Sequence, residues 1–209
     1  MRTITLEEHF ATPAFFQGPA RFVRERAQKI GDRYLAVLDR LCDLGPRRLS
    51  EMDAAGIDMQ VLSLSAPGVE QMPPRDAVDM ARATNDYLAE AVSAHPTRYA
   101  GFAALPTGAP AEAVAELERR MGDGFVGAVI NGHNQGRYLD DKFYWPILEA
   151  AEALGAPIYL HPTPPPQPVI DASYGGFAPM VTDMLASAAW GWHIETAVHM
   201  LRLILGGVF

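Results

Sequence analysis

Ile4-Thr5-Leu6-Glu7-Glu8-His9, close to the N-terminus, joins a short apolar run to side chains of the kind that bind metals. A second apolar run, Pro157-Ile158-Tyr159-Leu160, ends in His161. In a (β/α) barrel the functional side chains lie at the carboxyl ends of parallel strands. Two strands that each end in such residues therefore predict a metal site on a barrel of this type.

Strand-like and helix-like segments alternate along the chain, which implies parallel βαβ units and an α/β fold. The Pro- and Gly-rich residues 164–181 are expected to form a loop, followed by a last helix that ends near Leu205. The other predicted strands cover residues 3–9, 58–65, 99–105, 125–130 and 157–160, and the other predicted helices cover 21–43, 47–55, 75–94, 110–121 and 143–154.

Either a doubly wound sheet or a TIM barrel fits this alternation. A nucleotide-binding sheet is disfavoured, because the first strand leads into His9-Phe10-Ala11-Thr12 without a G-x-G-x-x-G motif, and no P-loop occurs. Polar residues at strand ends favour the barrel. We therefore expect residues 1–209 to form one domain, a TIM-type barrel that stops after about five βα units. The strand-end residues behind this prediction are Glu7, His9, Ser65, Asn131 and His161.

Composition and charge exclude several classes of protein. The formal net charge of −8 argues against nucleic-acid binding, which selects a basic surface. The single cysteine, Cys42, excludes an internal disulfide, fits a reducing cytosol, and is expected to pack within a helix. No secretory signal and no apolar run long enough for a transmembrane helix is visible. We expect a cytoplasmic protein that binds neither nucleic acid nor membrane.

Glu7 and His9 are two positions apart on one predicted strand, so their side chains share a face, and Glu8 points to the other face. A carboxylate and an imidazole together suit Zn²⁺ or a similar divalent ion. His161 supplies a third ligand, which is the number that a catalytic metal commonly takes from the protein. The alternatives are a polar strand end at Glu7 and His9 and a hydrogen-bonded structural histidine at His161.

Other polar residues have two interpretations each. Asn131 could bond a substrate oxygen or could simply begin an Asn-Gly turn, and His133 on the same loop is expected to be exposed. Glu195 and His199 share a helix face and could form a rival metal pair. An intrahelical hydrogen bond between them is the favoured interpretation, because no third ligand accompanies them.

Aromatic residues cluster after the first strand and before the last helix. Phe15, Phe16 and Phe22 could line a pocket over the metal or could pack in the core. Trp190 and Trp192 are expected to serve in packing or in contacts between subunits.

Short stretches spread in order over almost the whole chain resemble one enzyme family, the amidohydrolase-related decarboxylases. That family contains the γ-resorcylate, 2,3-dihydroxybenzoate and 5-carboxyvanillate decarboxylases, and the Glu-Glu-His-Phe form is most similar to the first of these. The matching stretches are Leu6-Glu7-Glu8-His9-Phe10-Ala11, Met52-Asp53-Ala54-Ala55-Gly56-Ile57, Leu62-Ser63-Leu64-Ser65-Ala66-Pro67, Phe102-Ala103-Ala104-Leu105-Pro106, Gly124-Phe125-Val126-Gly127-Ala128, Asn131-Gly132, Tyr159-Leu160-His161-Pro162 and Glu195-Thr196-Ala197-Val198-His199.

The resemblance implies a divalent metal, Zn²⁺ or Mn²⁺, held by Glu7, His9 and His161. It implies non-oxidative decarboxylation of a hydroxybenzoate without an organic cofactor, with the substrate carboxylate and ortho-hydroxyl chelating the metal. By position, Phe22 would contact the substrate ring and Asn131 would line the pocket. The family also implies a homo-oligomer, a dimer or tetramer, for the full-length protein.

The chain departs from the family at its C-terminus. Family members continue with a His-x-Gly-Glu motif that carries a catalytic histidine and with a late aspartate that binds metal and transfers a proton, whereas this sequence ends at Phe209. We therefore expect the catalytic histidine and aspartate beyond Phe209, with none in this chain. A partial barrel would expose sheet edges, and we expect the chain to be a fragment that is inactive alone.

Two rival functions follow from the same residues. The first is a metal-dependent hydrolase of the wider amidohydrolase superfamily, but such enzymes usually carry His-x-His on the first strand and a lysine or glutamate on the fourth. Here the corresponding residues are Glu7-x-His9 and Ile130-Asn131. The second rival is a non-catalytic product that binds partners through an exposed edge or the apolar last helix.

Overall fold

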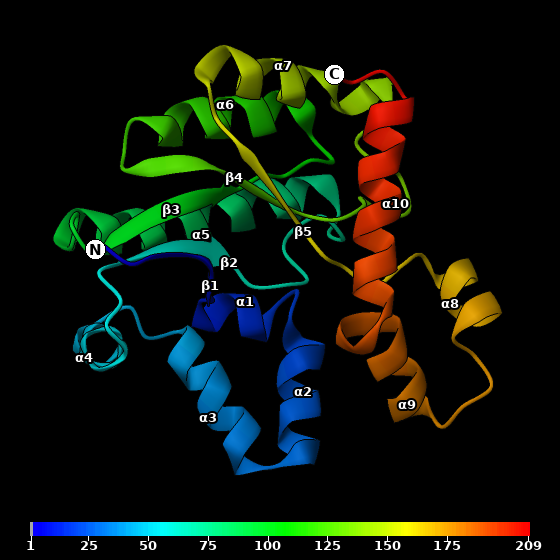
Figure 1. Cartoon of the computed structure of the whole chain (residues 1–209), viewed down its shortest axis with the longest axis horizontal. Coiled ribbons are helices and arrows are strands. Elements are labelled where there is room, and N and C mark those ends of the chain that lie inside the picture. Colours follow the sequence, from blue (N-terminus) through cyan, green and yellow to red (C-terminus); the bar gives the residue numbers. More distant parts are fainter. Residues whose placement is uncertain (1) are drawn as a thin grey trace.

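The computed structural model describes residues 2–209, and its centre is one parallel sheet of five strands in the order β1-β2-β3-β4-β5 (Figure 1). This consecutive order confirms the predicted α/β class. It excludes the doubly wound alternative, whose strand order reverses at a switch point. The strands are β1 (Ile4–Phe10), β2 (Met59–Leu64), β3 (Tyr99–Ala104), β4 (Phe125–Asn131) and β5 (Ile158–His161).

Helices follow the strands, and proline and glycine mark many of their ends. Pro74 and Pro110 stand at the first positions of two helices, where a missing N–H costs nothing. Gly56 and Gly155 end two others in the left-handed conformation. The helices are α1 (Pro13–Gln17), α2 (Arg21–Ile30), α3 (Asp32–Leu41), α4 (Pro46–Ala55), α5 (Pro74–Ala94), α6 (Pro110–Met121), α7 (Trp145–Leu154), α8 (Gln167–Ser173), α9 (Pro179–Met184) and α10 (Gly191–Leu205).

Two predicted segments differ in the structure. The single helix predicted over 21–43 is wrong, because the chain breaks at Gly31, whose φ of 124° no helix allows, and forms α2 and α3. The predicted loop 164–181 is also wrong, because it contains α8 and the first half of α9. Each of these short helices has a proline in its first turn, where the fixed φ favours helix formation.

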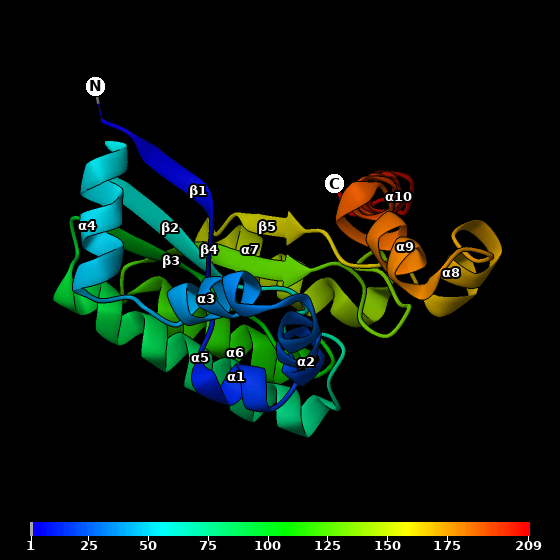
Figure 2. The ribbon, with the colours of Figure 1, turned by 90° about the horizontal axis from the view of Figure 1, so that it is seen from below.

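The sheet has two different faces. One face packs against α5, α6 and α7, which lie along it in Figure 2, and this layer holds the larger core cluster. The other face carries a small separate cluster of Val61, Ala100, Phe102 and Val129, with Tyr159 against it. The helices thus cover the sheet as they would cover the outside of a barrel, and the small cluster lies on the concave side, which we call the inner face.

An irregularity in β1 sets which residues reach the inner face. Thr5 pairs with Gln60 and Glu8 pairs with Leu62, so Leu6 and Glu7 together lie opposite Val61. Such a bulge inserts one extra residue and re-phases the strand. Because Val61 belongs to the inner cluster, Glu7 and then His9 face inward, while Glu8 faces the helices.

α10 stands beyond the carboxyl ends of β4 and β5, beside α8 and α9 (Figure 1). One side of α10 buries Glu195, His199 and Leu203, whereas Leu201 and Leu205 on other sides are exposed. The helix is therefore amphipathic, with a polar buried stripe. Over residues 2–209, no helix combines the length and the apolar character needed to cross a membrane.

A buried asparagine ties the longest helix to the middle strand. Asn85 on α5 is fully buried, and its amide donates to the Ala104 carbonyl at 3.0 Å and accepts from the Ala104 N–H at 2.9 Å. It also donates to the carboxylate of Glu116 on α6 at 2.7 Å. The carboxyl end of β3 thereby gains fixed backbone partners from α5.

Replacing Asn85 with alanine is expected to lower the free energy of unfolding by about 2–4 kcal/mol, because both Ala104 backbone groups stay buried without their partner. Urea denaturation followed by circular dichroism measures this loss. The control is Asp79→Ala on the exposed side of α5, which we expect to change stability by less than about 0.5 kcal/mol. Equal stability of the two variants would contradict the role given to Asn85.

Candidate metal centre

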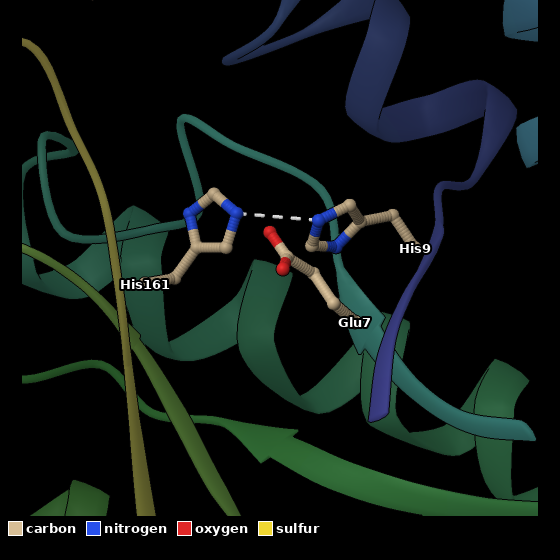
Figure 3. Close-up of side chains that lie close together, drawn as sticks. All are labelled: Glu7, His9 and His161. Atoms are coloured by element: carbon tan, nitrogen blue, oxygen red, sulfur yellow. Dashed lines mark hydrogen bonds between the residues drawn. The ribbon is translucent and has the colours of Figure 1, made fainter. Parts of the chain in front are cut away.

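Glu7, His9 and His161 converge on the inner face, with one ligand atom from each within 4.8 Å of the others (Figure 3). They come from β1 and β5, the two edge strands of the sheet. In a flat sheet the four intervening spacings would hold these strands about 19 Å apart. The curl of the sheet instead brings the Nε2 atoms of His9 and His161 to 3.2 Å.

The hydrogen bonds of the two histidines identify their free nitrogen atoms. Nδ1 of His161 lies 2.8 Å from the Pro162 carbonyl oxygen, which can only accept, so Nδ1 carries the proton and Nε2 has a free lone pair. Nδ1 of His9 lies 3.0 Å from the Ser63 hydroxyl. With a proton on that nitrogen, the Nε2 lone pair of His9 also points into the site.

Burial makes both rings neutral ligands. It lowers the pKa of His161 to about 4, with a smaller contribution from His9, and it lowers the pKa of His9 as well. Two lone pairs that face each other repel, and the carboxylate of Glu7 adds negative charge, so the set is complementary to a cation. Ligand atoms around a tetrahedral Zn²⁺ lie about 3.4 Å apart, close to the 3.2 Å observed. The donor set therefore fits a divalent metal.

Aromatic rings surround this cluster. The ring of Tyr159 lies 5.7 Å from that of Phe102 and 5.8 Å from that of His161, and Trp192 lies 6.1 Å from His161 on another side. Burial, reinforced by the carboxylate of Glu7, raises the pKa of Tyr159 to about 12. The site is thus a charged centre with an aromatic wall, which suits a flat, anionic organic ligand.

Sequence reasoning missed three of these neighbours. It placed Trp192 in packing or in subunit contacts, and it gave no role to Ser63 or Tyr159. Tyr159 was open to prediction, because it precedes His161 by two positions on one strand and so shares its face. Ser63 and Trp192 carry no such signal, since their positions depend on strand register and on the path of the chain to α10.

The structure places the two predicted substrate contacts differently. Asn131 is 1% exposed and pairs in register with His161, so it lies on the inner face beside the metal ligands. Phe22 lies on α2 with 57% of its side chain exposed, and it is outside the three-residue cluster. Phe15 and Phe16 belong to the core, which resolves their two interpretations in favour of packing.

Glu8 faces away from the metal ligands, as the strand alternation predicts. Its carboxylate lies 3.9 Å from the guanidinium of Arg48 on α4. Arg48 also donates to the carbonyl of His9 at 2.8 Å. Glu8, which lies between Glu7 and His9 in the sequence, therefore helps to attach β1 to α4 through Arg48.

The prediction for His133 is wrong. The residue is buried, its Nε2 donates to the Pro164 carbonyl at 3.2 Å, and its Nδ1 accepts from the Gly136 N–H at 3.0 Å. His133 thus joins the loop after β4 to the loop after β5. Its two hydrogen bonds compensate for the loss of solvent contact when this polar side chain is buried.

The predicted bond between Glu195 and His199 does not form among the described residues. His199 instead accepts from the Leu139 N–H at 3.0 Å through Nε2, and burial lowers its pKa to about 4. Both side chains are buried because α10 covers the segment that follows β4. The pair lies outside the metal cluster, so the rival metal site receives no support.

Comparison with known sequences agrees with this geometry. The family model described as "Amidohydrolase" matches residues 9–209. The γ-resorcylate decarboxylase of Polaromonas sp. strain JS666 is 41% identical over 214 residues, which cover 99% of this chain and 62% of that protein. This chain therefore spans about three fifths of the length of the curated relatives it matches most strongly.

Solved structures give the same result. A 5-carboxyvanillate decarboxylase from Novosphingobium aromaticivorans, complexed with manganese and 4-hydroxy-3-methoxy-5-nitrobenzoic acid, has a TM-score of 0.86 and 35% identity over 97% of this chain and 60% of that chain. A dihydroxybenzoic acid decarboxylase from Polaromonas sp. JS666, with bound manganese and 2-nitroresorcinol, has a TM-score of 0.82 and 41% identity over 97% of this chain and 60% of that one. Because the family model covers nearly all of the sequence and the fold agrees, the chain belongs to the amidohydrolase family.

Proposed function

We propose that this protein is a carboxy-lyase that acts in the metal-dependent, non-oxidative decarboxylation of a hydroxybenzoate-type acid. The observation that carries the proposal is the inward-facing set of Glu7, His9 and His161. Its Glu-x-His order differs from the His-x-His expected for a hydrolase. The names of the relatives, γ-resorcylate and 5-carboxyvanillate decarboxylase, support the same reaction.

Glu7, His9 and His161 would hold the divalent ion, and the manganese of the solved relatives favours Mn²⁺ over Zn²⁺. When bound, the ion would act as a Lewis acid and as a template for a carboxylate and its neighbouring hydroxyl. The protein supplies the orientation of these ligands. Ser63 and the Pro162 carbonyl fix the two imidazole rings, so that both Nε2 atoms are presented together.

The remaining site residues would bind the organic acid. We assign the aromatic wall of Tyr159 and Trp192 to the ring, and Asn131 to a polar group of the ligand. Phe22 is proposed as a further ring contact from α2. In the reaction the bond from the ring to the carboxyl carbon breaks, its electron pair stays on the ring carbon, and a proton takes the place of CO2. We assign that proton to no residue among 2–209.

Composition and the surface of α10 suggest the cellular location and the assembly of the protein. A single cysteine and an acidic composition suit the cytoplasm. Apolar side chains exposed on α10, such as Leu201, Ile204 and Leu205, suit contacts between copies in a homo-oligomer.

Replacing His161 with alanine is expected to weaken Mn²⁺ binding at least about 100-fold, since loss of an outer partner of a metal ligand alone commonly costs 10–100-fold. Isothermal titration of the EDTA-treated chain with MnCl2 measures this effect. His193→Ala is the matched control, because His193 is exposed on α10. His193→Ala should bind Mn²⁺ as tightly as the unaltered chain. If His161→Ala did so too, the metal centre would be wrongly placed.

The Mn²⁺-loaded chain is expected to bind 2,6-dihydroxybenzoate at least about tenfold more tightly than the EDTA-treated chain, because a charge-assisted contact contributes that much. Tryptophan fluorescence reports binding, since Trp192 lies against His161. The control ligand is 3,5-dihydroxybenzoate, whose hydroxyls cannot chelate together with the carboxylate. Equal affinity with and without Mn²⁺ would refute the proposed function.

A further inference from the structure

A buried carboxyl group lies next to the proposed site without belonging to it. Glu70, in the loop after β2, is 1% exposed, and its Oε1 accepts the backbone N–H of Asn131 at 2.7 Å. Its other oxygen, Oε2, has no hydrogen-bond partner among the described residues. Burial raises the pKa of Glu70 to about 7, although the hydrogen bond from the Asn131 backbone N–H opposes this. A fully buried carboxyl group with one unpartnered oxygen is rare in folded proteins and is often linked to function.

The loop that carries Glu70 is shaped around Asn131. It passes the end of β3, which lies between β2 and β4, to reach the end of β4. At Gly68, whose φ is 66°, an added Cβ would lie 2.2 Å from Oε2 of Glu70 and 2.3 Å from Nδ2 of Asn131. Both atoms therefore border the space that a side chain at position 68 would fill, and only glycine leaves room for them.

Asn131 itself is incompletely satisfied. Its side chain is buried, yet neither Oδ1 nor Nδ2 has a hydrogen-bond partner among residues 2–209. It ends β4 and pairs in register with His161, and Val129 two positions earlier belongs to the inner cluster. The unpartnered amide thus lies on the face that carries the metal ligands, where a ligand group can satisfy it.

The chemistry of the pair decides which end of the amide faces the ligand. In its ionised form, which predominates above the pKa of about 7, the Glu70 carboxylate only accepts hydrogen bonds, so it attracts the Nδ2 donor and repels Oδ1. Nδ2 is the atom that lies beside Glu70 at Gly68. We propose that Glu70 is a positioning residue: by accepting the backbone N–H of Asn131 and keeping its second oxygen beside Nδ2, it makes Oδ1, a hydrogen-bond acceptor, the group presented to the ligand. The inference deepens the proposed function and rests on it for the identity of that ligand.

With Oδ1 of Asn131 facing the ligand, the site should favour an acid that carries a second ring hydroxyl, one that does not coordinate the metal and can donate to Oδ1. The Mn²⁺-loaded chain is expected to bind 2,6-dihydroxybenzoate at least about tenfold more tightly than 2-hydroxybenzoate, which lacks the second hydroxyl. In Glu70→Gln the new amide donor faces Nδ2, so the Asn131 amide should rotate and this ratio should fall below about threefold. Isothermal titration measures both ligands.

Three comparisons separate positioning from a general structural effect. Glu70→Gln keeps an acceptor for the Asn131 N–H, so its melting temperature and its Mn²⁺ affinity should match those of the unaltered chain. Asn131→Ala should lose the ligand preference, and adding Glu70→Gln to it should change the ratio no further. Glu118→Ala, at an exposed carboxylate on α6, should retain the tenfold ratio. A full ratio in Glu70→Gln would overturn the proposal.

A second readout is independent of any ligand. In the Zn²⁺-loaded, ¹⁵N-labelled chain, the Nδ2 protons of Asn131 should show nuclear Overhauser contacts to the Hα protons of Gly68, and Glu70→Gln should abolish them. Persistence of those contacts in Glu70→Gln would overturn the positioning role. If the metal-loaded chain bound neither acid, the proposed function would fail, and these contacts alone would decide the role of Glu70.

Discussion

The curl of the parallel sheet is the constraint on which the metal centre depends. β1 and β5 share no ladder hydrogen bonds, yet their inward side chains meet at 3.2 Å between two imidazole nitrogen atoms. The larger core cluster packs between the sheet and its helices on the outer face, whereas the inner face carries only the small cluster of Val61, Ala100, Phe102 and Val129. Distant parts of the sequence thereby come together in one cluster, whose two histidines are 152 positions apart in the chain.

The bulge in β1 is the second condition for the site. It places both Leu6 and Glu7 opposite Val61, so that the residues that follow are in phase with the inner face. A regular strand in register with Thr5 and Gln60 would send Glu7 and His9 toward the helices. The cost is an exposed Leu6, 59% accessible, and an exposed Glu7. A local irregularity therefore decides the chemistry, as bulges beside functional sites often do.

Much of this was predictable from the sequence, and the limits have physical causes. The positions of the strands and the residues of the cluster, Glu7, His9 and His161, follow from apolar runs that end in polar residues, which is a local pattern. The break at Gly31 was missed because a helical charge pattern continues across it, although the backbone does not. Burial of His133 was missed because it depends on the loop after β5, where Pro164 lies. The partner of His199 was missed because it depends on α10 folding back over the segment after β4. The partner of Asn131, Glu70, lies 61 positions away, and no local pattern links them.

The apolar and polar parts of the inner face impose opposite demands on stability. Two neutral imidazoles are held beside a carboxylate at the end of a sheet whose edge strands have no backbone bonds to each other, and bringing the imidazoles out of water costs free energy. A cation between them would repay that cost and would also join β1 to β5. By linkage, an ion present at 100 times its dissociation constant adds about 2.7 kcal/mol to stability. That is a large share of the 5–15 kcal/mol typical of a whole domain. The arrangement of Glu7, His9 and His161 would therefore also make a bound metal a structural link between β1 and β5.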